Sequence, residues 1–258
     1  MRKNSVRQRL RSGKPALGAL LGLGSPHVAE LMAHAGYDWL VLETEHNALD
    51  AAQVERMLMA ISGTDVIPLV RPPSGDPLVI QKALDIGAMG VFIPMVRSAA
   101  EAEAIVRATR YPPEGRRGFG PLRASRYTLD YADYLASANE NILVALILET
   151  KEAVEDIEAI MDVPGIDALY FGLFDLCLSL GLNPMEMPFP EIDDIMERTL
   201  ALGRERGVAV GVGATTPDEL RQRLSQGYTF MNYGTDYQLL RDAVLAGIDA
   251  FRAAPSEE

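Results

Sequence analysis

Runs of consecutive apolar residues recur along the whole chain and are separated by stretches with helical spacing. A strand that is buried on both faces of a parallel sheet reads as a continuous apolar run, not as an alternating one. The runs therefore predict parallel strands, and a helical stretch follows nearly all of them. The predicted strands are Ala16–Leu23, Trp39–Glu43, Val66–Arg71, Gly90–Met95, Ile142–Glu149, Ala168–Gly172, Val208–Gly213 and Phe230–Gly234.

Polar residues placed before a proline mark where several helices begin. A Ser, Thr or Asp side chain accepts a hydrogen bond from a free amide of the first turn, and proline suits the first helical position. At the other end, Asp236–Ala254 reads as an amphipathic helix, and we expect a frayed tail at Pro255–Glu258. The predicted helix starts are Ser25-Pro26, Asp76-Pro77, Thr216-Pro217 and Thr150-Lys151.

Eight strands that alternate with helices over 258 residues predict one (β/α)₈ TIM barrel of the α/β class. We find no shift in composition that would divide the chain, so residues 1–258 are interpreted as a single barrel domain. An open doubly wound sheet is the alternative fold.

One segment, Arg110–Tyr127, interrupts the alternation. It is rich in Gly, Pro and Arg and shows no periodicity. A long irregular loop in a compact domain is usually functional or disordered. We expect it either to cover the mouth of the barrel or to line a subunit contact; a solvated basic loop is the alternative.

Composition narrows the function classes. The chain is 48% hydrophobic and carries a net charge of −12, which disfavours nucleic acid or an anionic membrane as partners. The single cysteine, Cys177, excludes an intrachain disulfide and is interpreted as a small buried hydrophobe. The basic N-terminus lacks a following apolar segment of signal length, because Leu17–Leu23 is short and rich in glycine. We therefore expect a cytoplasmic protein.

Two predicted strands lead to a carboxylate. The run Ile142–Leu148 ends on Glu149, and Ala168–Gly172 is followed within three residues by Asp175. Parallel α/β folds build their active sites at the C-terminal ends of their strands. Two carboxylates without a nearby His or Cys cluster suit a hard cation such as Mg²⁺ or Mn²⁺. The alternative is that one of them caps a helix or pairs with an arginine.

Two further strands deliver a basic side chain to the same rim. Arg71 directly follows Val66–Val70, and because a buried arginine is rare unless it is paired, it needs a partner or an anionic ligand. His46 follows Trp39–Glu43 and is a candidate general base, with a surface imidazole as the alternative.

Two acids are candidates for supporting roles. Asp85 lies near the end of the predicted helix Pro77–Ile86 and could orient His46, although such a residue is also common at helix ends. Glu45 could hold a water beside a metal ion or pair with a nearby arginine.

The lysines exclude one mechanism. There are four, at positions 3, 14, 82 and 151, and none lies within a predicted strand. A Schiff-base lysine must be desolvated to become nucleophilic. Carbon–carbon chemistry next to a carbonyl would therefore depend on metal and arginine.

The motifs, taken in order, resemble the HpcH/HpaI family of class II pyruvate aldolases, which act on 4-hydroxy-2-oxoheptanedioate or 2-keto-3-deoxy sugar acids. The resemblance runs from about Leu17 to Asp236. The segments that carry it are GYDWLVLETEH, PLVRPPSGDP, LDIGAMGVFIPMV, RATRYPPEGRRGFGPLRASRY, LETKEAVEDIEAIMDVPGID and YFGLFDL.

This resemblance implies a modified barrel that assembles as a homohexamer and exchanges its C-terminal helix between subunits. It implies a divalent metal (Mg²⁺ or Mn²⁺, with Co²⁺ as a further option) on Glu149 and Asp175, chelated by pyruvate. It also implies that Arg71 stabilises the enolate and that His46 and Asp85 form a proton-transfer pair. Backbone amides around Gly172 and Phe174 would hold the pyruvate carboxylate.

The chain departs from the family pattern beside these residues. Ile147 stands where the family usually has glutamine, and Gly172-Leu173-Phe174-Asp175-Leu176-Cys177 replaces Gly-Pro-x-Asp-Leu-Ser. Glu43-Thr44-Glu45-His46 replaces Asp-x-Glu-His. We interpret Glu43, Glu45 and Ile147 as residues that support the site, and Leu173 as part of the substrate-binding turn. These changes predict a more apolar pocket for the aldehyde.

The leading hypothesis is therefore a metal-dependent aldolase that cleaves or forms 4-hydroxy-2-oxo acids from pyruvate and an aldehyde through a metal-stabilised enolate. Decarboxylation of oxaloacetate through the same enolate is the second hypothesis. A non-catalytic barrel that binds a 2-oxo acid is the third, and the joint presence of His46, Arg71 and Asp85 argues against it.

Overall fold

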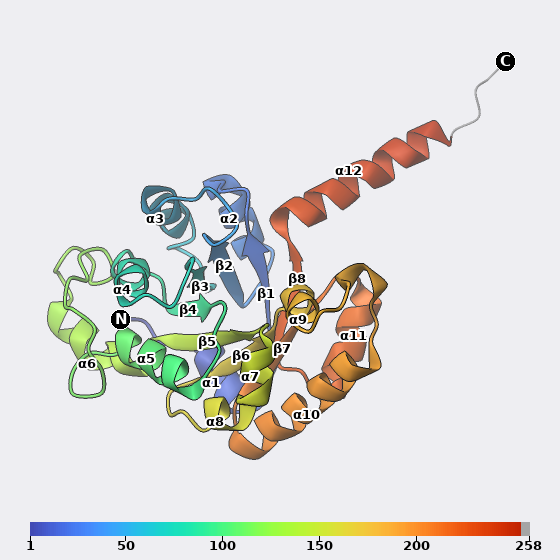
Figure 1. Cartoon of the computed structure of the whole chain (residues 1–258). Coiled ribbons are helices and arrows are strands. Elements are labelled where there is room, and N and C mark those ends of the chain that lie inside the picture. The colour runs from blue at the N-terminus through green and yellow to red at the C-terminus, as the bar shows by residue number, and fades with distance from the viewer. Residues whose placement is uncertain (254–258) are drawn as a thin grey trace.

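A computed structural model describes residues 1–253, and the predicted tail at 255–258 lies outside these residues. Eight parallel strands form a closed barrel in sequence order, which confirms the (β/α)₈ prediction and excludes the open sheet (Figure 1). The strands are β1 (Ala16–Leu21), β2 (Trp39–Glu43), β3 (Ile67–Arg71), β4 (Gly90–Ile93), β5 (Leu143–Leu148), β6 (Ala168–Phe171), β7 (Ala209–Ala214) and β8 (Phe230–Thr235).

Helices follow the strands and surround the barrel. All four predicted capping residues accept a hydrogen bond from an amide of the first turn of their helix. The α-helices are α1 (Ser5–Arg11), α2 (Pro26–His34), α3 (Ala51–Ala60), α4 (Pro77–Asp85), α5 (Ala99–Thr109), α6 (Tyr131–Asn141), α7 (Lys151–Glu155), α8 (Ile157–Met161), α9 (Leu173–Ser179), α10 (Pro190–Arg206), α11 (Pro217–Gln226) and α12 (Asp236–Arg252), and a 3₁₀ turn η1 spans Pro184–Glu186.

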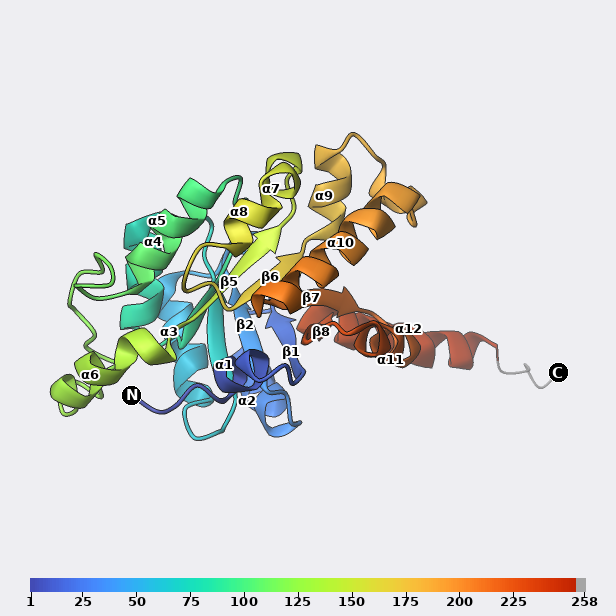
Figure 2. The same ribbon diagram turned by 90° about the horizontal axis from the view of Figure 1, so that it is seen from below.

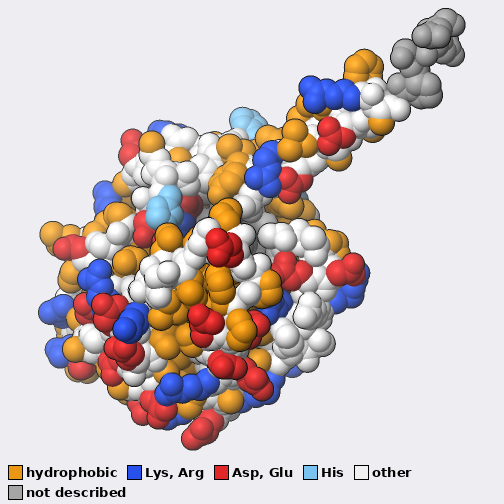
Figure 3. Space-filling view, turned by 45° about the vertical axis from the view of Figure 1, so that its right-hand side comes forward, with side chains coloured by type: hydrophobic (Ala, Val, Ile, Leu, Met, Phe, Trp, Pro, Cys, Tyr) orange, Lys and Arg blue, Asp and Glu red, His pale blue; other side chains and the backbone are white. Residues whose placement is uncertain are grey.

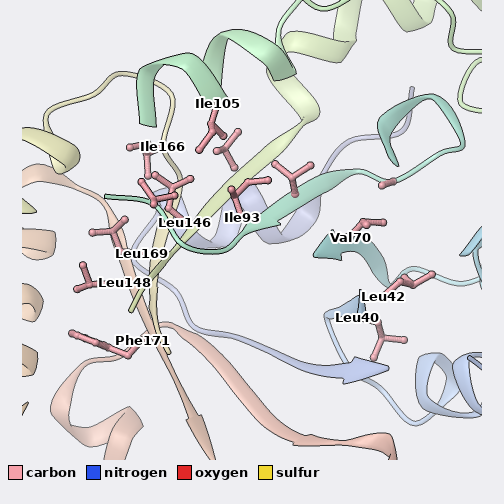
Figure 4. Packing of buried hydrophobic residues seen from close by; sticks show 14 of the residues in the cluster. Leu40, Leu42, Val70, Ile93, Ile105, Leu146, Leu148, Ile166, Leu169 and Phe171 are labelled. Atoms are coloured by element: carbon pink, nitrogen blue, oxygen red, sulfur yellow. The ribbon is translucent and has the colours of Figure 1, made fainter. Parts of the chain in front are cut away.

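The alternation of side chains along each strand divides the core into two regions. Inward residues fill the barrel with aromatic rings, of which Trp39 and Phe230 stack with their centroids 4.3 Å apart. Gly18 on β1 makes room for the Trp39 ring, because a Cβ atom at position 18 would lie 1.9 Å from the indole. Outward residues such as Leu146 and Leu148 pack against the helices (Figure 4).

Helix α1 was not predicted, and it closes the N-terminal end of the barrel (Figure 2). Its apolar residues Val6 and Leu10 belong to the inner core cluster. Arg7 is buried, and its Nε lies 2.8 Å from both carboxylate oxygens of Asp167. Just before the helix, the backbone amide of Asn4 donates to Asn141 Oδ1 at 2.9 Å.

The irregular segment Arg110–Tyr127 lies at this same N-terminal end. Helix α5 runs antiparallel to the strands, so the chain leaves it on the side opposite the C-terminal rim. Arg123 Nη1 in the segment donates to the carbonyl of Ile86 at 2.7 Å, close to the start of β4. The expectation that the segment covers the mouth of its own barrel is therefore wrong; its place in a subunit contact stays a prediction.

Helix α12 differs from the other helices because it projects away from the barrel (Figure 1). Along Asp236–Arg252 only Asp236 is buried. That carboxylate accepts hydrogen bonds from the amides of Gly22 at 2.8 Å and Leu23 at 3.0 Å. The start of α12 is thus fixed to the end of β1, Leu239 packs against the core, and residues 240–252 are solvent-exposed in a single chain.

Candidate active site

The predicted site residues come from the C-terminal ends of neighbouring strands. Trp39 lies in the inner core, so two steps of strand alternation direct Glu43 toward the barrel axis. Glu43 is in register with Arg71 on β3, and the alternation on β5 directs Glu149 inward above Ile147. The barrel thus brings these side chains together at one rim, as the sequence predicted.

Glu43 is the most connected residue of this rim, and it is buried at 3% exposure. One carboxylate oxygen accepts from the amides of Glu45 at 2.6 Å and His46 at 3.1 Å. The other oxygen accepts from Arg71 Nε. The β2–β3 junction is closed further by Thr44, whose amide and hydroxyl both donate to the Arg71 carbonyl, at 3.0 and 2.7 Å.

His46 has Glu45 as its neighbouring carboxylate. His46 Nε2 lies 3.4 Å from Glu45 Oε2, and the same oxygen lies 3.3 Å from Arg71 Nε. This oxygen is buried, and no donor among residues 1–253 reaches it in hydrogen-bond geometry. Burial and the nearby charges of Glu43 and Asp175 raise the pKa of Glu45, against the opposing effect of Arg71 and His46.

Asp85 is not beside His46, which corrects the predicted pairing within one chain. It is the last residue of α4, which runs antiparallel to the strands, so it lies at the N-terminal end of the barrel. There its carboxylate pairs with the buried Arg117 at 2.7 Å. Arg117 also donates to Tyr134 at 3.2 Å. In this chain Asp85 holds the irregular segment, and Glu45 occupies the place beside the imidazole.

Glu149 is buried at 3% exposure and accepts a hydrogen bond of 2.6 Å from the amide of Met95. Burial raises the pKa of Glu149 to about 7, and the charges of Glu45 and Asp175 add to the increase, although the Met95 amide and Arg71 oppose it. Met95 has a φ of +56°, so the backbone after β4 turns to direct this amide at the carboxylate. Met95 gave no signal in the sequence, because only its backbone takes part.

The turn after β6 leaves space at the other oxygen of Glu149. A Cβ atom at Gly172 would lie 2.4 Å from Glu149 Oε2 and 3.0 Å from Ile147 Cγ2, so the position requires glycine. Helix α9 begins directly after Gly172 without a capping side chain, and Asp175 lies exposed in its first turn. Phe174, in the same turn, is 54% exposed, whereas Cys177 is fully buried, as expected of a small hydrophobe.

This donor set fits a divalent cation. Glu149 is buried, its pKa is raised, and other acids lie close to it, so a bound cation would relieve the cost of its negative charge. The cation would occupy the space that Gly172 leaves beside Glu149 Oε2. Among residues 1–253 no three His, Cys, Asp or Glu side chains gather as a ligand group. Glu149 and Asp175 would therefore leave most positions to water or substrate, as Mg²⁺ sites commonly do.

A cavity of about 220 Å³ opens beside the rim residues. It is lined by Glu43 on β2, by His46 in the turn after β2 and by Arg71 on β3. Thr235 on β8 and Tyr237 on α12 line it as well. The last two were missed in the sequence. The signal that could have found them is Asp236, an acid directly after a strand, which is the same pattern that identified Glu149.

Removing the charge of Glu149 is expected to stabilise the metal-free protein at alkaline pH. Because its pKa is raised from 4.5 to about 7, its contribution to stability is full below pH 4.5 and is lost as the pH rises through about 7. In EDTA at pH 8, Glu149→Gln should raise the free energy of unfolding by roughly 2–3 kcal/mol, with a smaller gain near pH 5. Urea unfolding at both pH values measures this; a less stable variant at pH 8 would contradict it.

Comparison with known proteins finds one family along nearly the whole chain. The family model described as HpcH/HpaI aldolase/citrate lyase matches residues 18–243. A 4-hydroxy-2-oxo-heptane-1,7-dioate aldolase from Shigella sonnei is 38% identical over 248 residues, which are 95% of this chain and 93% of that protein.

Solved structures agree with this result. An HpcH/HpaI aldolase/citrate lyase family protein from Burkholderia cenocepacia superposes with a TM-score of 0.92 at 36% identity, over 97% of this chain and all of that chain. The HpcH/HpaI aldolase from Desulfitobacterium hafniense gives a TM-score of 0.90 at 28% identity, over 98% of both chains.

Within residues 1–253, no helix has the length and apolar character that a membrane span requires.

Proposed function

The chain belongs to the HpcH/HpaI aldolase/citrate lyase family, and on that basis we propose that it is a class II aldolase that joins pyruvate to an aldehyde or cleaves the 4-hydroxy-2-oxo acid they form. The observation that carries the proposal is the meeting of Glu149, Asp175, Arg71 and His46 at one end of the barrel.

Glu149 and Asp175 are the residues that would hold the divalent cation on which enzymes of this family generally depend, with Mg²⁺ or Mn²⁺ as first choices and Co²⁺ as a third. When bound, the cation would draw electron density from the 2-oxo group of pyruvate, which makes the neighbouring methyl group acidic near neutral pH. The amides of Gly172 and Phe174, at the uncapped start of α9, would hold the pyruvate carboxylate together with Leu173.

Arg71 is the residue that would carry the negative charge that develops on the 2-oxo oxygen. Its Nε is bound by Glu43, and within residues 1–253 its two terminal nitrogens donate to no protein acceptor. Those nitrogens belong to a side chain that lines the cavity. A fixed guanidinium stabilises charge with little reorganisation, which is the main requirement for lowering the activation barrier to enolate formation.

His46 is the group that would move the proton. Its side chain is 60% exposed at the cavity, and Glu45 Oε2 lies 3.4 Å from its Nε2. A carboxylate beside an imidazole stabilises the imidazolium that forms when the base accepts a proton. Glu45 thus takes the supporting role that the sequence gave to Asp85.

Purified protein with Mn²⁺, pyruvate and a panel of aldehydes is expected to show aldol formation that EDTA abolishes. Because Ile147 is buried below the site and Phe174 stands exposed beside it, aliphatic or aromatic aldehydes should be preferred to an acidic semialdehyde, by about 10-fold in kcat/KM. Steady-state assays of product formation measure both effects. A preference for the polar aldehyde would contradict the acceptor proposal, and oxaloacetate decarboxylation without any aldol product would contradict the function.

We also propose that the protein is a homo-oligomer, namely a hexamer in which α12 packs on a neighbouring subunit. Five side chains form an apolar stripe along α12, with exposures from 38% at Ile248 to 83% at Phe251 (Figure 3). Their spacing of three or four residues places them on one helix face. The members of the stripe are Tyr237, Leu240, Val244, Ile248 and Phe251.

Light scattering is expected to give about six times the chain mass of 28.1 kDa at micromolar concentration. Introducing charge into the stripe with Leu240→Glu and Val244→Glu together should reduce that mass, because burying two unpaired carboxylates in a subunit contact is unfavourable. Asp249→Lys, on the opposite face of α12, is the matched control and should leave the mass unchanged. A wild-type monomer would refute the assembly.

A further inference from the structure

We propose that Glu43 is the positioning residue of this site: it holds Arg71 and the turn that carries His46 in one fixed arrangement. This inference rests on the proposed function, because its value lies in presenting Arg71 to a 2-oxo acid. Both carboxylate oxygens of Glu43 already accept hydrogen bonds from the protein, so its role does not require contact with the substrate.

The contacts of Glu43 distinguish it from the other acids at the rim. Its two oxygens bind in different directions, one to the amides of Glu45 and His46 and the other to Arg71 Nε. Glu43 is 3% exposed, so these bonds form out of contact with bulk water, where charge-assisted hydrogen bonds are strong. One carboxylate therefore joins the charged group of β3 to the turn after β2.

The hydrogen bond to Nε determines which edge of the guanidinium remains available to a ligand. Arginine offers five N–H donors in a rigid planar fork. When Nε is bound to Glu43, the plane of the fork is fixed and both terminal nitrogens stay available for the ligand. If this bond is lost, Arg71 keeps Glu45, at 3.3 Å from Nε, as its acidic neighbour at the rim. The guanidinium could then turn toward Glu45 and away from the cavity.

Glu43→Gln separates the contact of Glu43 with the backbone amides from its contact with Arg71. Its amide oxygen can still accept from the amides of Glu45 and His46, so the turn can keep its hydrogen bonds. Its NH₂ group would face Arg71 Nε, and two donors repel each other. Glu43→Asp keeps the charge but is one methylene shorter, so it can retain a weaker hold on Arg71.

We expect Glu43→Gln, assayed as the Mn²⁺-loaded enzyme, to lose about 10–100-fold in kcat while the KM for pyruvate changes by less than about 3-fold. Glu43→Asp should recover part of the lost kcat. Glu158→Gln is the matched control, because Glu158 is 55% exposed and pairs with Arg198 on the surface. Its kcat should equal that of the wild type.

A thermodynamic cycle with Arg71→Ala separates positioning from general structural damage. If Glu43 acts through Arg71, adding Glu43→Gln to Arg71→Ala should change neither turnover nor the calorimetric affinity for oxalate, a planar dianion that resembles the enolate of pyruvate. An equal loss in both backgrounds, or a single variant with wild-type kcat and wild-type oxalate affinity, would overturn the inference. If the wild type forms no aldol with any aldehyde, the proposed function fails, and the oxalate measurements still decide the role of Glu43.

Discussion

Replacing Glu149 by alanine is expected to reduce kcat/KM by about 10³-fold or more in the presence of saturating Mn²⁺. The cation supplies several kcal/mol of charge stabilisation, and every 1.4 kcal/mol corresponds to a factor of ten in rate. Glu149 provides one of two carboxylates in the proposed ligand set, and its free oxygen faces the space that Gly172 leaves open. The variant should therefore lose both cation affinity and turnover.

Asp175→Ala should give a similar loss, because the proposed set contains no third acid that could replace it. Titration of each variant with Mn²⁺, followed by electron paramagnetic resonance, measures cation binding separately from activity. Glu152→Ala is the control, since this acid lies exposed on α7 only three residues beyond Glu149. Full activity of either site variant, or of the wild type after treatment with EDTA, would show that the two carboxylates do not hold a catalytic metal.

Arg71→Lys is expected to lower kcat by about 10²-fold while the KM for pyruvate rises by a smaller factor. Lysine keeps the positive charge, but it offers one ammonium group in place of a planar fork. In the structure the fork uses Nε for Glu43, and its terminal nitrogens donate to no acceptor within residues 1–253. A single ammonium cannot pair with Glu43 and reach the 2-oxo oxygen at the same time.

The measurement is steady-state kinetics over a range of pyruvate concentrations at a fixed aldehyde concentration. Arg198→Lys, on the exposed face of α10, is the matched control because it makes the same change away from the site. An unchanged kcat with only a higher KM would mean that Arg71 binds pyruvate in the ground state and contributes nothing further to the transition state.

The strand order, the barrel and the rim that carries the acids could be predicted from the sequence. The reason is physical: a doubly buried strand has to be apolar throughout, so the first charged residue after it marks the end of the strand. Arg71 and Glu149 were both found in this way, whereas Glu43 was singled out by its departure from the family pattern. Their contacts were not, because the bond between Glu43 and Arg71 depends on the register of β2 against β3.

The errors have the same origin. Asp85 was expected beside His46 because the family resemblance implies a His–Asp pair, but within one chain a residue at the end of a helix lies at the opposite end of the barrel from a residue at the end of a strand. The same geometry misplaced the segment Arg110–Tyr127. Helix α1 was missed because its apolar residues, Val6 and Leu10, are few and stand among basic ones.

The position of α1 across the N-terminal end of the barrel affects the order in which the helices dock during synthesis. Its buried partners are far along the chain: Asn141 is 137 residues from Asn4, and Asp167 is 160 residues from Arg7. Contacts of such long range form late, because the intervening chain must be closed first. Helix α1 therefore remains without its buried acidic partner Asp167 until the chain as far as β6 has been made. Its arginines keep it hydrated during that interval, so α1 completes its docking only after six of the eight strands of the barrel have been made.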